Sequence, residues 1–376
     1  MIIERFYQNL AKQMTPKRVL VIYGPRRAGK TTLLGQFLQG TNFKHKLESG
    51  ASLRVRQVLN SQDFRQISDF VAGYQLIVID EAQYIPKVGA GLKIIADEHP
   101  EVRLIATGSS SFDLSQQVGE PLTGRKWTIT LYPLAQMELA KLYNHYELKG
   151  RLEEFLLFGS YPEVVTAKSK KAKIKILREL SESYLLKDIL ALEQIKNSQV
   201  LLNLLKLLAF QVGQLVSMNE LATQLHINIR TVERYLDLLE KTFVIYGLGG
   251  YSRNLRKTIS QKKKYYFLDN GVRNALISQF NSLDLRDDAG QLWENFLVSE
   301  RLKKQEYKNI RPNNYFWRTW EGQEVDWVEE QNGALRGFEF KWGDGKKVKQ
   351  PKDWKKTYKK TSFQVINKEN YLDFLV

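Results

Sequence analysis

The sequence RVLVIYGPRRAGKTTLLGQFL, residues 18–38, combines three local signals that decide the fold of the first part of the chain. Val19 to Tyr23 form a short apolar run, which is typical of a buried parallel strand. GPRRAGKT follows and fully matches the pattern G-x-x-x-x-G-K-T, after which apolar residues recur at helical spacing. A strand, a glycine-rich loop and a helix in this order predict a phosphate-binding loop.

The residues of this loop have distinct expected roles. Backbone N–H groups of a glycine-rich loop wrap phosphates, and the amino end of the following helix adds a favourable field. Lys30 is expected to reach the β and γ phosphates, and the Thr31 hydroxyl to hold Mg²⁺. Arg26 and Arg27 lie inside the loop, where they are placed to touch phosphate or a neighbouring subunit. The predicted cofactors are therefore ATP and Mg²⁺.

Two more apolar runs end in polar residues. LIVIDEAQYIP, residues 76–86, predicts a strand after which Asp80 supports the metal and Glu81 polarises the attacking water. VRLIATGSSS predicts a third strand, whose Thr107 either senses the γ-phosphate or belongs to a plain turn. The predicted nucleotide-binding set is Gly24, Pro25, Arg26, Arg27, Ala28, Gly29, Lys30, Thr31, Thr32, Asp80 and Thr107, with Thr31 and Asp80 on the metal.

These strands and the helices between them predict a doubly wound α/β domain over residues 1–135, with nucleotide at the carboxyl ends of the strands. Arg125, in LTGRKW, is a candidate donor of positive charge to the transferring phosphoryl group. It would act in cis or from a neighbouring subunit, so a homo-oligomer is one expectation. A surface salt bridge explains the same arginine equally well.

The composition limits the remaining function classes. The chain has 376 residues, enough for two or three domains, and lacks cysteine, which excludes disulfides, cysteine-ligated zinc and Fe–S clusters. The net charge of +16 favours a polyanionic partner, most simply DNA, although an anionic membrane surface or a lysine-rich proteome gives the same number. No apolar run approaches membrane-spanning length, and MIIERFYQNLAKQM lacks a signal-peptide core. A soluble cytoplasmic protein without a membrane partner is expected.

Residues 136–280 are predicted to form a helical region that contains a winged helix-turn-helix. NELATQL is one helix, capped by Ser217 with Glu220 three residues on, HIN is a tight turn, IRTVERYLDLLEKT is a second helix, and an apolar strand follows. Residues 253–264, RNLRKTISQKKK, hold six basic groups and no acid. The predicted DNA-binding residues are Arg230, Arg234, Lys262, Lys263 and Lys264. The alternative is a helical packing module that makes protein contacts only.

EVDWVEEQNGALRGFEFKW, residues 324–342, predicts a β-hairpin with a two-residue turn at Asn332-Gly333. Alternation along the first arm places Glu324 and Asp326 on the face opposite Val325 and Trp327. On the second arm, Glu339 and Lys341 lie opposite three apolar residues, Phe338, Phe340 and Trp342. Three acids and a lysine therefore line one side of the ribbon, an arrangement that solvated charges alone would explain.

The chain resembles bacterial and archaeal P-loop ATPases of the AAA type that carry a winged-helix segment and a C-terminal domain related to restriction-endonuclease-like folds. The segments that carry the resemblance run in order along the chain: GPRRAGKTTLL, VIDEAQYIP, ATGSSS, LTGRKWTITLYPL, GSYPEVV, YLLKDI, YYFLDNG, GQLWENFLVSERL, EVDW and FEFKW. The resemblance implies a third domain over residues 281–376.

The resemblance also implies a site. In the restriction-endonuclease-like fold a helical glutamate precedes a strand aspartate and an E-x-K pair, and here Glu294, Asp326, Glu339 and Lys341 match. Carboxylates from several elements suit Mg²⁺, which generates or orients a hydroxide. The implied metal ligands are Glu294, Asp326 and Glu339. Asp326, Glu339 and Lys341 thereby join Lys30, Glu81 and Arg125 in the predicted catalytic set.

Three functions are consistent with this sequence. The first is an ATPase that binds DNA and couples ATP turnover to DNA remodelling or metal-dependent cleavage. The second is an ATP-driven regulatory switch, and the third is a nucleotide-gated DNA-binding regulator. In the second and third hypotheses the C-terminal domain is catalytically silent.

Overall fold

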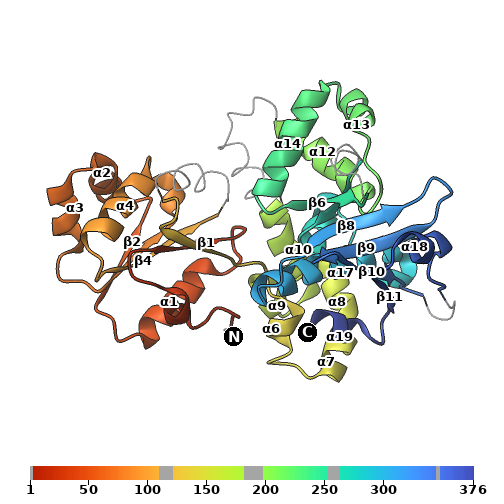
Figure 1. Cartoon of the computed structure of the whole chain (residues 1–376), viewed down its shortest axis with the longest axis horizontal. Coiled ribbons are helices and arrows are strands. Elements are labelled where there is room, and N and C mark those ends of the chain that lie inside the picture. Colours follow the sequence, from red (N-terminus) through yellow and green to blue (C-terminus); the bar gives the residue numbers. More distant parts are fainter. Residues whose placement is uncertain (1–2, 110–121, 182–197, 253–261, 344–347) are drawn as a thin grey trace. The chain divides into compact units, whose positions relative to one another are not determined.

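The computed structural model describes residues 3–109, 122–181, 198–252, 262–343 and 348–376, and it divides the chain into two compact units (Figure 1). The N-terminal unit comprises residues 2–133 and 241–243, and the C-terminal unit comprises residues 134–240 and 244–376. The predicted boundary after residue 135 lies close to this division. The predicted boundary after residue 280 instead falls inside the C-terminal unit. Within the described ranges, no helix has the length and apolar character that crossing a membrane requires.

The N-terminal unit is a five-stranded parallel sheet with strand order β2-β3-β4-β1-β5. Its elements are η1 (Leu10–Gln13), β1 (Val19–Tyr23), α1 (Lys30–Gly40), β2 (His45–Ser49), α2 (Leu53–Ser61), α3 (Phe64–Val71), β3 (Leu76–Asp80), η2 (Ala82–Tyr84), α4 (Val88–Glu98), β4 (Arg103–Gly108) and β5 (Lys126–Thr130).

Strand β1 is buried on both faces because helices cover both sides of this sheet. Val19, Val21 and Tyr23 share one core with apolar residues of α2, α3 and α4. Leu20 and Ile22 are also buried and point to the other face, on which Figure 1 shows α1. A continuous apolar run is what such a strand needs, as the sequence predicted.

The C-terminal unit combines helices with a six-stranded mixed sheet of order β11-β10-β9-β8-β6-β7. Its helices are α6 (Gln136–Leu139), α7 (His145–Gly150), α8 (Leu152–Phe158), α9 (Pro162–Thr166), α10 (Lys170–Glu179), α12 (Ser198–Phe210), α13 (Met218–Leu225), α14 (Ile229–Lys241), α16 (Asn270–Leu276), η4 (Leu283–Leu285), α17 (Ala289–Tyr307), α18 (Lys352–Thr357) and α19 (Tyr371–Leu375). Its strands are β6 (Ile245–Gly250), β7 (Lys264–Phe267), β8 (Asn313–Arg318), β9 (Glu324–Gln331), β10 (Ala334–Phe340) and β11 (Thr361–Ile366).

The sheet explains why the predicted second and third domains form one compact unit. Strand β6 pairs with β7 on one side and runs parallel to β8 on the other, with Gly249 opposite Tyr315 and Gly250 opposite Phe316. Backbone hydrogen bonds therefore cross the expected boundary at residue 280. This pairing joins residues more than 60 positions apart, which no local pattern in the sequence reveals.

The predicted hairpin of residues 324–342 is present as β9 and β10. Gln331 pairs with Ala334, and Asn332 and Gly333 both have positive φ angles, of 54° and 75°. Val325 and Trp327 are fully buried, and Phe338 and Phe340 are nearly so. The apolar faces of both arms are therefore core, as the alternation predicted.

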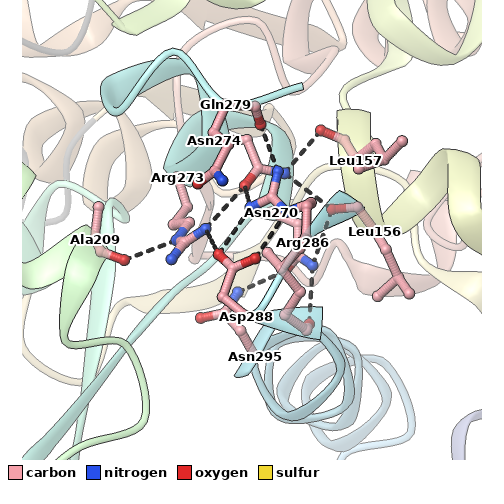
Figure 2. A network of polar contacts seen from close by, with 11 residues as sticks. Leu156, Leu157, Ala209, Asn270, Arg273, Asn274, Gln279, Arg286, Asp288 and Asn295 are labelled. Carbon is pink, nitrogen blue, oxygen red and sulfur yellow. Dashed lines mark hydrogen bonds and ion pairs between the residues drawn. The ribbon is translucent and has the colours of Figure 1, made fainter. Parts of the chain in front are cut away.

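A buried polar network fastens α8, α12, α16 and α17 together (Figure 2). Asp288 accepts hydrogen bonds from Arg273 Nη1 at 2.5 Å and from Arg286 Nε at 2.7 Å. Asn274 donates to the carbonyls of Leu156 at 3.1 Å and Leu157 at 2.9 Å. Burial alone would raise the pKa of Asp288, but the hydrogen bonds and charges of the two arginines outweigh it and lower that pKa.

We expect Asp288→Asn to lower the free energy of unfolding of the C-terminal unit by about 3 kcal/mol or more, because two buried arginines lose their counter-ion. Thermal and urea unfolding, followed by tryptophan fluorescence, measure the loss. Asp284→Asn, an exposed acid four residues earlier, is the matched control and should leave the midpoint unchanged. Equal stability of the two variants would contradict the assignment of Asp288 as a structural counter-ion.

Candidate functional site

The glycine-rich loop of residues 24–29 connects β1 to α1 and closes over the side chain of Lys30. Lys30 is 5% exposed, and its Nζ donates hydrogen bonds to the carbonyls of Gly24 at 2.8 Å and Pro25 at 3.0 Å. A Cβ on Gly24 would lie 2.1 Å from the carbonyl oxygen of Leu131, so only glycine fits there. Arg27 has a φ of 61°, a left-handed conformation that is strained for a non-glycine residue.

Asp80 is the centre of a hydrogen-bond network at the carboxyl ends of β3 and β4. Thr31 Oγ1 donates to Asp80 Oδ2 at 2.7 Å, and the Thr107 hydroxyl donates to Asp80 Oδ1. The backbone N–H of Glu81 reaches both Asp80 Oδ1 and Thr107 Oγ1 at 3.1 Å. The structure therefore brings Thr31, Asp80, Glu81 and Thr107 to one edge of the sheet.

Glu81 is held by residues that the sequence did not single out. It has a φ of 55°, and its carboxylate accepts a hydrogen bond from Gln83, which also donates to Ser109 Oγ at 3.2 Å. A Cβ on Gly50 would lie 2.2 Å from the Glu81 carbonyl oxygen, so Gly50 allows this turn to approach β2. Gln83 lies in the run LIVIDEAQYIP, so its place beside Glu81 could have been noticed in the sequence. Gly50 could not, because it follows β2, whose sequence HKLES has no apolar pattern.

This edge of the sheet fits a Mg²⁺-nucleotide. Thr31 and Asp80 offer hard oxygen ligands beside Lys30, and these three residues would hold the ion and the phosphates. The bound ion would neutralise charge that develops on the transferred phosphoryl group. Arg5 supports the loop from outside, because its guanidinium donates to the carbonyls of Ala28 at 2.5 Å and Tyr132 at 2.6 Å.

Arg125 lies at the opposite end of β1 from the loop. Its carbonyl accepts from Val19 N at 2.9 Å, at the start of β1, whereas the loop follows Tyr23, about 13 Å further along the strand. Its guanidinium forms an ion pair with Asp97 at 2.5 Å. The predicted role of Arg125 in cis is therefore wrong, because the strand separates it from the loop of its own chain, and a role from a neighbouring subunit stays a prediction.

A second cluster lies in the C-terminal unit, where the hairpin meets β7 and α17. Lys264 Nζ on β7 forms ion pairs with Glu294 Oε1 at 3.5 Å and Glu324 Oε1 at 2.5 Å. Phe340 N donates to Asp326 Oδ2 at 2.8 Å, and Lys341 Nζ lies 2.7 Å from Glu339 Oε1. We call Glu294, Glu324, Asp326, Glu339, Lys264 and Lys341 the acid cluster.

Burial shapes the charge of this cluster. Burial, together with the charge of Glu294, raises the pKa of Asp326 from 3.8 to about 7. Burial and the charge of Asp326 likewise raise the pKa of Glu339 from 4.5 to about 7. Burial alone would lower the pKa of Lys264, but the charges of Glu294, Glu324 and Asp326 outweigh it and raise that pKa. Lys264 is therefore charged at neutral pH, and Asp326 and Glu339 are part-protonated.

The implied metal ligands do not fit a metal ion as they stand. Among the residues that the structure describes, no three histidine, cysteine, aspartate or glutamate side chains are arranged to hold one. An ammonium group instead lies against Glu294. The metal set of Glu294, Asp326 and Glu339 is therefore not assembled, although Asp326, Glu339 and Lys341 do belong to one cluster.

The structure separates the predicted DNA-binding residues. Arg230 and Arg234 are exposed on α14, and Lys262 is exposed before β7, whereas Lys263 pairs with Glu240 at 3.6 Å. Lys264 is 3% exposed, so its predicted contact with DNA is wrong: it belongs to the acid cluster. Most of the basic run, residues 253–261, lies outside the described residues.

Three family matches cover most of the chain. Residues 16–140 match an AAA domain. Residues 149–283 match a domain of unknown function (DUF8612), and residues 289–372 match another (DUF4143). The AAA match and the geometry around Lys30 and Asp80 agree, so the first part of the chain is an AAA-type P-loop ATPase domain, which implies a nucleotide cofactor.

Two relatives with similar sequences are described as uncharacterised proteins. A Haemophilus influenzae protein is 29% identical over 299 residues, which are 73% of this chain and 73% of its own length. A Mycobacterium tuberculosis protein is 28% identical over 331 residues, which are 86% of this chain and 70% of its own. Among solved structures, a signal-transduction ATPase with numerous domains from Pyrococcus horikoshii is 14% identical with a TM-score of 0.30, over 81% of this chain and 46% of that chain. A TM-score of 0.30 does not establish a shared fold over the whole chain.

We expect Asp326→Asn to gain stability relative to wild type as the pH rises. Between the unfolded pKa near 4 and the folded pKa of about 7, the folded state keeps a proton that the unfolded state releases, so wild-type stability falls with rising pH. Asparagine does not titrate, and the difference between pH 5 and pH 8 should be about 2 kcal/mol.

Urea unfolding of the C-terminal unit at both pH values measures this difference. Glu321→Gln, at an exposed carboxylate of the neighbouring turn, is the control, and its stability difference from wild type should be the same at both pH values. A stability difference between Asp326→Asn and wild type that is the same at pH 5 and pH 8 would disprove the raised pKa.

Proposed function

We propose that this chain is an ATP-hydrolysing protein whose nucleotide state controls DNA binding by residues 198–267. The observation that carries the proposal is the order of elements there. Helix α12 is followed by Leu215, which bridges to Lys264, and then by α13, α14 and the antiparallel pair of β6 and β7. This order, a helix, an isolated β-bridge, two helices and an antiparallel strand pair, supports a winged helix-turn-helix.

The exposed side chains of α14 favour contact through its first two turns. Arg230 and Arg234 are exposed near the amino end, which is the part of a recognition helix that reaches base edges. Glu233 and Asp237 are also exposed, and their charges oppose a deep insertion of the whole helix between phosphates. The net charge of +16 supplies the attraction for a polyanion.

The P-loop residues divide the ATPase work among themselves. Lys30 and the loop backbone bind the phosphates, and Thr31 and Asp80 hold Mg²⁺. Glu81 accepts a proton from the attacking water, and Gln83 orients its carboxylate. Arg125 would contribute only in an oligomer, where it would stabilise the phosphoryl group of a nucleotide bound to a second copy of the chain.

Metal-dependent cleavage is the second candidate function. It is favoured by the gathering of Asp326, Glu339 and Lys341 and by the raised pKa values of the two acids. The carboxylates as placed do not fit a metal, so we derive no cleavage step from them. Incubation of the protein with labelled DNA and a divalent cation separates a silent C-terminal cluster from an active one.

Glu81→Gln should keep ATP binding and lower ATP turnover by about 10²-fold or more, because the water loses its proton acceptor. Equilibrium binding of a fluorescent ATP analogue and steady-state phosphate release measure the two effects. Glu98→Gln, an exposed acid at the end of α4, is the control and should match wild type. Unchanged turnover in Glu81→Gln would remove Glu81 from the catalytic set.

Replacing Arg230 and Arg234 with alanine should weaken DNA binding and lower the slope of log K against log salt by about 1 for each phosphate that is no longer neutralised. Fluorescence anisotropy with duplex, single-stranded and branched DNA measures this, with and without ATP. Lys206→Ala, an exposed cation on α12, is the control. Equal affinities of the double variant and wild type on every substrate would overturn DNA binding through α14.

The same samples, incubated with Mg²⁺ or Mn²⁺, test the second candidate. A silent cluster leaves every labelled DNA intact. Cleavage by wild type that disappears in Asp326→Asn would show that the protein is a nuclease rather than a gated regulator.

A further inference from the structure

Lys264 occupies the middle of the acid cluster rather than its rim. It is the first residue of β7, is 3% exposed, and its ammonium lies between Glu294 of α17 and Glu324 of β9. The Phe316 ring centroid is 5.5 Å from Nζ. An ammonium so enclosed has exchanged its hydration shell for carboxylate oxygens, as a bound metal ion does.

The other polar atoms of the cluster mostly have donors from within the chain. The Tyr266 hydroxyl donates to Glu294 Oε1 at 2.6 Å, and Arg318 Nη1 lies 3.6 Å from Glu324 Oε2 at the exposed side. Asp326 accepts from the backbone, and Lys341 binds Glu339. Glu339 Oε2 alone is buried without a partner among the cluster's described atoms.

The charges of the cluster are already largely balanced. Four carboxylates face two lysines, and Arg318 adds a third cation at the rim. A divalent cation that approached Glu294 or Glu324 would meet the Lys264 ammonium on the same oxygens and would have to displace it. The lysine has no second place to go at this depth without losing its counter-ions.

We propose that Lys264 is the resident cation of the acid cluster and that it keeps divalent cations out of it. The cluster then ties β7, α17 and β9 together as an ionic core. This inference does not depend on DNA binding or on ATP hydrolysis, because it concerns only which cation the carboxylates hold.

Mn²⁺ titration of the full chain without nucleotide, followed by the electron paramagnetic resonance of free Mn²⁺ at pH 7.5, tests the proposal. All samples carry Asp80→Asn, so that the P-loop does not contribute a site. With Lys264 in place, no Mn²⁺ site tighter than about 1 mM should appear. Lys264→Met should create one site that binds at least about ten-fold more tightly, since the competing charge is gone.

Two variants serve as controls, one for the charge at position 264 and one for the loss of a lysine at the adjacent position. Lys264→Arg keeps the resident charge and should exclude Mn²⁺ as the parent does. Lys263→Met removes the adjacent, half-exposed lysine and should also leave Mn²⁺ binding unchanged. Lys264→Met combined with Glu324→Gln removes one charge of each sign, so it keeps the balance if Lys264→Met alone does not fold.

Two outcomes overturn the proposal. One is a stoichiometric Mn²⁺ site in the protein that carries only Asp80→Asn, if adding Asp326→Asn abolishes that site. This comparison needs no Lys264 variant. The other is a folded Lys264→Met, or its combination with Glu324→Gln, that binds no more Mn²⁺ than the parent. A new site that disappears again on adding Asp326→Asn supports the resident-cation role.

Discussion

Taking an ion out of water costs several kcal/mol unless another charge or fixed dipole replaces the solvent, and helix α17 is built around that constraint. Glu294 meets Lys264 of β7, Glu300 accepts from Gln136 N at 2.6 Å, and Arg301 binds Glu329 of β9 at 2.6 Å. Lys303 reaches the Leu134 carbonyl at 3.1 Å and Ser160 Oγ at 2.9 Å. These partners come from β7, β9, the segment of residues 134–136 and Ser160, so α17 satisfies all of them in one position only. The sheet and the surrounding helices are arranged about that position.

Backbone conformation shapes the nucleotide-binding edge of the N-terminal unit, alongside the buried side chains of Lys30 and Arg5. Arg27 and Glu81 both adopt left-handed conformations, which cost of order 1–3 kcal/mol each in a non-glycine residue. The buried strands around them hold these turns in place, and Gly24 and Gly50 allow neighbouring backbone to approach. Two of the positive-φ residues of this unit therefore lie in the turns that carry the nucleotide residues.

The sequence was sufficient to predict those features that are formed by residues adjacent to one another along the chain. The strand-loop-helix of residues 18–38 and the Asn332-Gly333 turn each follow from adjacent residues, and the structure has both. Lys264 was misplaced because a run of three lysines resembles a solvated surface, whereas all four residues of β7 are buried. Its partners, Glu294 and Glu324, lie 30 and 60 positions later in the sequence, so only the folded chain reveals them. The sequence left the role of Arg125 open between its own chain and a neighbouring subunit for a related reason, because it did not show that β5 is an edge strand alongside β1.

The pairing of β6 with β8 sets an order of events during synthesis. Strands β6 and β7 leave the ribosome well before residues 313–318, and at about 5–20 residues per second the delay is several seconds. During that time β6 presents an open edge, and Lys264 lacks Glu324, one of the two carboxylates that enclose its ammonium in the folded chain. The first residue of β7 thus keeps part of its hydration until β9, which carries Glu324, has been made.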